Sequence, residues 1–147
     1  MSLYFEDFAV GQAHRSSRPR SVSAKTIEAF AELSGDKNRL HLDEAYAAAT
    51  PFGQRIAHGL LGLSIASGLL HELGIVQESI LAFAGLEWRF KGPVRIGDEL
   101  SFEATVAKLK SMGAKGGVVV LAARLTTQDG RTVQEGTWTL MIRRRPA

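Results

Sequence analysis

Hydrophobic and polar positions in the first half of the chain follow a helical pattern. Ser23 is a favourable N-cap and Gly35 a favourable stop, and the apolar residues between them recur at helical spacing, so we expect a helix there. Asp43 is placed to cap a second short helix over 44–49, which Thr50-Pro51 would end.

A third helix is expected over 58–73, and its residues are apolar or small on nearly all sides. A helix with this pattern is normally buried. Small residues such as Gly62, Ala66 and Gly68 suggest that a sheet wraps closely around it.

The second half of the chain is patterned for strands. Apolar runs separated by turn residues predict strands over 80–90, 99–109, 118–125 and 132–142, and an edge strand over 13–22 interrupted at Pro19. The nearly continuous apolar run at 118–125 predicts a central strand covered on both faces. Asp129-Gly130 predicts a hairpin turn. The fold class expected is α+β, with a curved antiparallel sheet against one long central helix.

Composition narrows the class of protein. A chain of 147 residues with 45% apolar content suits a single domain, 1–147, with a real core. The first residues do not form a basic and then apolar leader, and no apolar run is long enough to span a bilayer, so we expect neither export nor membrane insertion. The absence of cysteine excludes disulfides, thiol nucleophiles and thiolate metal ligands, which fits a cytoplasmic protein.

Positive charge is concentrated in two clusters, Arg15, Arg18 and Arg20 near the start and 143–145 near the end, although the net charge is only +3. These clusters are either a solvated strand and tail or a means of attracting a phosphorylated ligand. Aromatic content is 7% and no binding motif is visible, so no nucleic-acid partner is expected.

The candidate chemistry lies between the first and third helices. A predicted loop carries Asp36, Asn38 and His41, and His58-Gly59 opens the long helix. A carboxylate, an imidazole and a helix amino terminus are suited to proton transfer beside a developing oxyanion. Taken singly, Asp36 could be a turn residue, His41 structural and His58 a capping or packing residue. No recognised ligand spacing supports a metal site.

The residues from Ser34 to His41, SGDKNRLH, resemble the signature of the MaoC-like hydratases, or (R)-specific enoyl-CoA hydratases. That signature combines an aromatic residue, a small residue, an acidic residue, Asn-Pro-x-His and a later alanine. Phe30 and Ala47 supply its outer positions, and Arg39 stands where the family usually has proline. Further matching segments are 52–53, 56–59, 67–70, 90–94 and 97–98, so the resemblance covers most of the chain.

The resemblance implies a hot-dog fold and a hydro-lyase of fatty acid metabolism, which adds water reversibly to a trans-2-enoyl thioester to give an (R)-3-hydroxyacyl thioester. Asp36 and His41 would hold the water and handle the protons as a pair, the Gly59 N–H would bind the thioester oxygen, and Ser67 would help to orient the pair. Asn38 and His58 are assigned to substrate binding.

The resemblance also bears on partners. It implies an acyl thioester of coenzyme A or acyl carrier protein as substrate, no metal or other cofactor, and a homodimer or dimer-based higher oligomer. The acyl length, the carrier, and which member of the acid-base pair is the base are left open.

Two other functions are compatible with the same fold. Thioester hydrolysis would require a carboxylate on the long helix, where Glu72 comes late and 58–70 contains no acidic residue. A non-catalytic acyl-thioester-binding protein or partner subunit is favoured only by Arg39.

Overall fold

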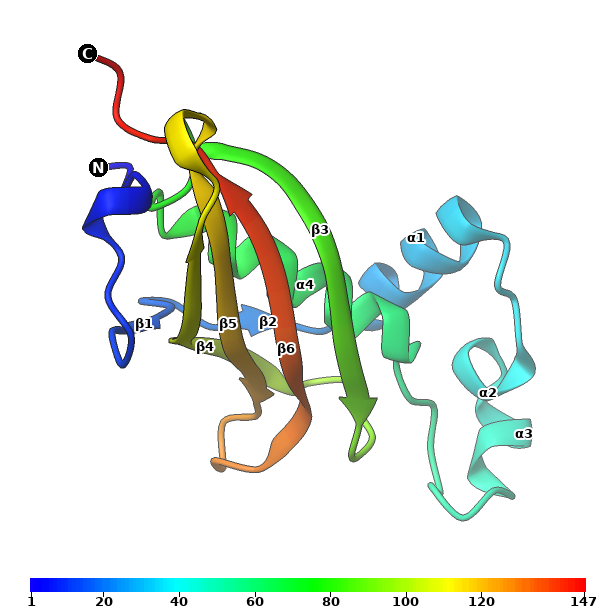
Figure 1. Cartoon of the computed structure of the whole chain (residues 1–147). Coiled ribbons are helices and arrows are strands. Elements are labelled where there is room, and N and C mark those ends of the chain that lie inside the picture. The colour runs from blue at the N-terminus through cyan, green and yellow to red at the C-terminus, as the bar shows by residue number, and fades with distance from the viewer.

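The chain forms a curved antiparallel sheet wrapped around one long helix, α4 (Figure 1). A computed structural model describes residues 1–147. The strands are β1 (Ala13–Arg15), β2 (Arg20–Ser21), β3 (Ile80–Phe90), β4 (Glu99–Ser111), β5 (Gly117–Thr126) and β6 (Thr132–Ile142). The helices are α1 (Ala24–Ser34), α2 (Arg39–Leu42), α3 (Glu44–Ala48) and α4 (Gly59–Glu72), with 3₁₀ turns η1 (Phe5–Asp7) and η2 (Gly113–Lys115). This is the hot-dog architecture that the resemblance implied.

The helix boundaries follow the predicted caps. The Ser23 side chain accepts a hydrogen bond from the Thr26 N–H at 3.1 Å, and Gly35 ends α1 with a left-handed φ of 80°. Asp43 caps α3 by accepting from the Tyr46 N–H at 3.0 Å. The sequence pattern did not reveal α2, because a single turn is too short to show a period.

The sheet order is β1-β4-β5-β6-β3, and β2 also pairs with β4. Pro19 lies between β1 and β2, so the predicted interruption of the edge strand is confirmed. Trp138, Leu140 and Ile142 of β6 are fully buried on the inner face of the sheet. They form part of a core to which α4 contributes Leu61, Ile65, Ala66, Leu69 and Leu70.

The outer face of the sheet is not covered. Along β5 buried residues alternate with more exposed ones: Val119 and Leu121 are buried, whereas Ala122 and Arg124 are exposed. The prediction that this strand is covered on both faces was therefore wrong. Its apolar run is nearly continuous because valine and alanine also occupy outward positions, although no helix lies over them.

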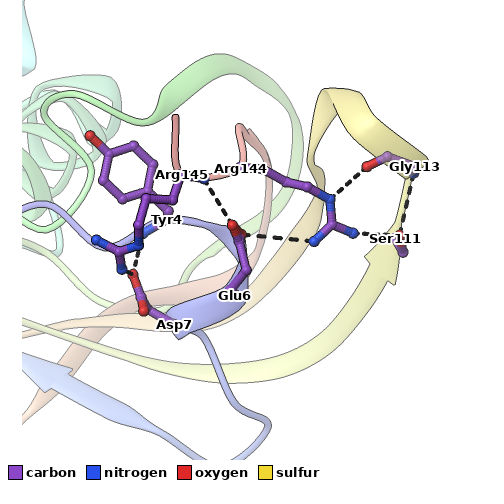
Figure 2. A network of polar contacts seen from close by, with 7 residues as sticks. All are labelled: Tyr4, Glu6, Asp7, Ser111, Gly113, Arg144 and Arg145. Carbon is purple, nitrogen blue, oxygen red and sulfur yellow. Dashed lines mark hydrogen bonds and ion pairs between the residues drawn. The ribbon is translucent and has the colours of Figure 1, made fainter. Parts of the chain in front are cut away.

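The second arginine cluster holds the two ends of the chain together (Figure 2). Arg145 pairs with Asp7, and its backbone N–H donates to Glu6 at 2.8 Å. Arg144 donates to the Gly113 carbonyl at 2.6 Å and to Ser111 at 2.9 Å. These cations are therefore engaged within the chain, at the end of the molecule where both termini lie (Figure 1).

The helices α1, α2 and α3 extend beyond one end of the sheet (Figure 1). Most of their residues are exposed, and Leu33 is 85% exposed. The chain returns from α3 to the sheet through 49–58, where Ile56 bridges to Arg95. No helix in the structure is both long enough and apolar enough to cross a bilayer.

Candidate active site

Asp36 lies immediately beyond α1, on an exposed loop. Gly35 reverses the chain there, and the Asp36 N–H donates to the Ser34 hydroxyl at 3.1 Å. The Asp36 carboxylate accepts a hydrogen bond from the Asn38 N–H at 3.3 Å. Local hydrogen bonds thus shape the loop and leave the carboxylate in contact with solvent.

His41 lies on α2, and its side chain is turned inward. It is 9% exposed, and its Nδ1 lies 2.8 Å from the Ile56 carbonyl oxygen. Because a carbonyl only accepts, Nδ1 carries the hydrogen and Nε2 keeps its lone pair. The backbone of His41 is held too, because Arg55 Nε donates to its carbonyl at 2.7 Å. The prediction that His41 lies on a loop was wrong, because it lies on α2.

Burial is the main influence on the protonation of His41. Loss of hydration lowers the pKa of the imidazole below its usual 6.5, the hydrogen bond that His41 donates to the Ile56 carbonyl opposes this shift, and the nearby His58 favours it. The Asp36 carboxylate raises the pKa by a smaller amount. The net direction is downward, so His41 is neutral at neutral pH and its Nε2 can accept a proton.

His58 connects the Asp36 loop, α2 and the start of α4. It is 2% exposed, and its Nε2 donates to the backbone carbonyl of Asp36 at 2.8 Å. Its ring stacks on His41 with centroids 3.9 Å apart and contacts Phe30 at 4.9 Å. The remaining nitrogen, Nδ1, is buried without a partner. These contacts of His58 hold the Asp36 backbone and the His41 ring in position.

The side chains of Asp36, His41 and His58 each place one ligand-type atom within 4.8 Å of the others. The two imidazoles nevertheless stack with only 27° between their planes. Imidazole lone pairs lie in the ring plane, so two nearly parallel stacked rings do not direct them at one ion. One nitrogen of each ring is also bonded to a backbone carbonyl. The cluster is better suited to proton transfer than to metal coordination.

A pocket of about 370 Å³ opens beside His41 and the first residue of α4. Its wall includes Gly59, Phe52, Phe90 and Gln134. A Cβ at Gly59 would lie 2.7 Å from the Phe90 ring, so only glycine leaves this space open. The Gly59 N–H is in the first turn of α4, where amides have no partner within the helix.

Sequence reasoning missed Gln134. This β6 residue is 2% exposed, and its side-chain Nε2 donates to the Gly59 carbonyl at 3.0 Å. Its Oε1 accepts from the Trp88 indole at 2.8 Å. The sequence shows only a glutamine within a predicted strand. Its apolar neighbours become apparent in the folded sheet.

The structure places Asn38 beside the cluster, where its backbone N–H bonds to Asp36, and places Ser67 apart from it. Asn38 caps α2 by accepting from the Leu40 N–H at 3.0 Å, and its side chain is exposed. Ser67 is half-buried on α4, eight residues after Gly59 and so about 12 Å further along the helix. It makes no hydrogen bond to Asp36 or His41.

Arg39 occupies the first position of α2, where proline is well tolerated. Its guanidinium pairs with Asp43 at 3.0 Å and lies 4.5 Å from the centre of the Tyr46 ring. Arg39 thus links α2 to α3, so this segment is tied down without the family proline.

Two other features are less suited to proton transfer than this cluster. A larger hollow of about 510 Å³ lies on the outer face of the sheet, but it is lined by paired charges such as Glu103 and Arg124 and contains no histidine. Glu72, at the end of α4, is paired with Arg20 at 2.8 Å. It lies some 13 residues from Gly59, which leaves the pocket without a helix carboxylate.

Comparisons with known proteins bear on the family and the fold of the chain. The family model described as MaoC like domain matches residues 7–129. The chain is 38% identical to the (R)-specific enoyl-CoA hydratase of Aeromonas caviae over 131 residues, 89% of this chain and 92% of that protein. It is 38% identical to the 3-hydroxybutyryl-CoA dehydratase of Methylorubrum extorquens over 107 residues, 73% of this chain and 66% of that protein. The crystal structure of the MaoC-like dehydratase from Rhodospirillum rubrum superposes with a TM-score of 0.89 at 33% identity, covering 99% of this chain and 100% of that one.

Proposed function

Given that the chain belongs to the family of MaoC-like hydratases and dehydratases, we propose that it adds water reversibly to a trans-2-enoyl thioester of coenzyme A or acyl carrier protein. The product is a 3-hydroxyacyl thioester of (R) configuration. The (R)-specific hydratase among its relatives supports the choice of substrate and product.

Asp36 and His41 activate the water in this proposal. The bare Nε2 of neutral His41 accepts one proton as the water oxygen bonds to the β carbon, and the Asp36 carboxylate accepts a hydrogen bond from the other O–H. Electrons of the double bond move to the thioester oxygen. The proton held by the pair is then returned to the α carbon, which restores the carbonyl and both catalytic groups.

The Gly59 N–H stabilises the enolate oxygen. It is a first-turn amide at the positive end of α4 and lies in the pocket wall. Loss of one oxyanion donor typically lowers kcat by about 10² to 10³. Asn38 and His58 serve by shaping the Asp36 loop.

One observation carries the proposal: a carboxylate and an imidazole with a free lone pair lie within 4.8 Å of each other, and the imidazole lines the pocket that contains the start of α4. Incubation with crotonyl-CoA tests it through the absorbance of the conjugated thioester. Hydration removes that absorbance and yields 3-hydroxybutyryl-CoA. Release of free thiol would instead identify a thioesterase, and binding without turnover would identify a non-catalytic protein.

We also propose that two copies pair along β3. This strand is at the edge of the sheet and is bonded only to β6. It exposes Leu81, Phe83, Leu86 and Phe90, which are 36% to 54% exposed. A long apolar edge is normally covered in a stable protein. Sedimentation should give twice the mass of the chain, and Leu86→Lys should shift it to the monomer; a wild-type monomer would refute the pairing.

A further inference from the structure

The proposed oxyanion donor is the backbone N–H of Gly59, and glycine is the residue type with the most flexible backbone. Glycine lacks the steric restriction that holds other backbones, and the Gly59 N–H has no partner within α4. A preorganised donor must nevertheless be fixed before the charge develops. Within α4, the peptide that carries this N–H is held through the His58 carbonyl, which accepts from the Leu61 N–H at 3.1 Å and the Gly62 N–H at 3.3 Å. Further restraint on Gly59 comes from contacts outside the helix.

The peptide before Gly59 is held through His58. That side chain is enclosed between Phe30 and His41 and bonded to the Asp36 carbonyl. The backbone on this side is tied to the same groups that handle the water.

The peptide after Gly59 is held through its carbonyl, to which Gln134 donates at 3.0 Å. The orientation of the Gln134 amide is determined by its partners. The indole N–H of Trp88 can only donate and the Gly59 carbonyl can only accept, so the amide between them has a single arrangement in which both bonds form. A rotation by 180° would set donor against donor and acceptor against acceptor.

The fold makes room for this contact. A Cβ at Gly62, one turn along α4, would collide with the Gln134 amide. Burial of an amide is unfavourable unless it is hydrogen-bonded, and Gln134 is 2% exposed at a site that faces the apolar core. A polar side chain at this position is therefore explained by the two bonds that it makes.

We propose that Gln134, locked by Trp88, is a positioning residue that fixes the Gly59 peptide at the start of α4. This inference rests on the proposed function, because it assigns Gly59 as the oxyanion donor. Gln134 also lines the pocket, but its amide is bonded to Trp88 and Gly59, so its proposed action is through the backbone.

Gln134→Leu removes both hydrogen bonds while keeping a similar volume. We expect kcat for crotonyl-CoA to fall about 10 to 100-fold, with KM changed less than about threefold, because misplacement affects the transition state most. Trp88→Phe should cause a smaller loss in the same direction, since it frees the amide to rotate. Ile142→Val, at the far end of β6, is the matched control: it should lower Tm slightly and leave kcat unchanged.

The order parameter of the Gly59 amide, measured by ¹⁵N relaxation, provides a readout that needs no turnover. It should fall in Gln134→Leu and stay at the wild-type value in Ile142→Val. If the wild-type protein hydrates no enoyl thioester, the proposed function fails and the order parameter alone decides the role of Gln134. An unchanged order parameter in Gln134→Leu, or an unchanged kcat in an active enzyme, would overturn the inference.

Discussion

Gly59→Ala tests the site with a single methyl group. The added Cβ would lie 2.7 and 2.9 Å from two carbons of the Phe90 ring, closer than carbon atoms approach in proteins. It would also narrow the pocket at the point where we propose that the thioester oxygen approaches the amide. The backbone itself accepts alanine, because Gly59 does not have a positive φ.

Stability and activity should respond differently. Alanine favours a helix by up to about 1 kcal/mol over glycine. Overpacking typically costs about 1 to 3 kcal/mol, because the Phe90 ring has to move aside. The net change in the free energy of unfolding is therefore about 0 to 2 kcal/mol, or a few degrees in Tm. Loss of the oxyanion contact should lower kcat/KM by about 10² to 10³.

The assay is hydration of crotonyl-CoA combined with thermal unfolding. Gly68→Ala is the control, because it makes the same change on the same helix at a position where a Cβ meets nothing within 4 Å. It should be as active as wild type and slightly more stable. If Gly59→Ala retains more than half of the wild-type kcat/KM, the start of α4 does not bind the thioester oxygen.

Three further predictions follow from the same contacts. Asp36→Asn should lower kcat by at least about 10² and leave Tm unchanged, because Asp36 is exposed. His41→Ala should lower both kcat and Tm, because His41 is buried. Equal unfolding curves for the two variants would contradict this expectation. Because burial lowers the pKa of His41, the acid limb of kcat/KM should have its midpoint below pH 6.5. The free energy of unfolding should also fall as the pH drops through 6.5, where only the unfolded chain takes up the proton. His14 shares this direction, so the comparison is with His41→Gln, which should flatten the pH dependence of stability in part. Arg144→Ala combined with Arg145→Ala should leave KM for crotonyl-CoA unchanged, because these cations lie near the far end of α4; a severalfold rise in KM would show that they attract the carrier phosphates.

Local chemistry made much of this fold predictable. Ser23, Gly35 and Asp43 act within a few residues of their own positions, so the sequence specifies their roles almost independently of the rest of the chain. The strand boundaries followed for the same reason from Pro19 and Asp129-Gly130. Residue types alone marked Asp36, His41 and Gly59 as candidate chemistry within one short span. Their meeting at one site was expected through the resemblance, since nothing in their spacing measures the return of the chain from α3.

What could not be predicted depends on long-range contacts. Gln134 reaches Gly59 from 75 residues away, and a glutamine in a strand gives no sign of which helix it will meet. The stacking of His58 on His41 likewise depends on how the helices beyond the sheet fold back. The uncovered face of β5 was mispredicted because valine fills a sheet equally well on either side.

The contacts that fasten residues 6–7 to 144–145 (Figure 2) leave both ends of the chain side by side, away from α2 and α3 (Figure 1). A short linker could therefore join one copy to the next head to tail without crossing the substrate entrance. Duplication of the coding sequence into a tandem protein would place few steric demands on this scaffold.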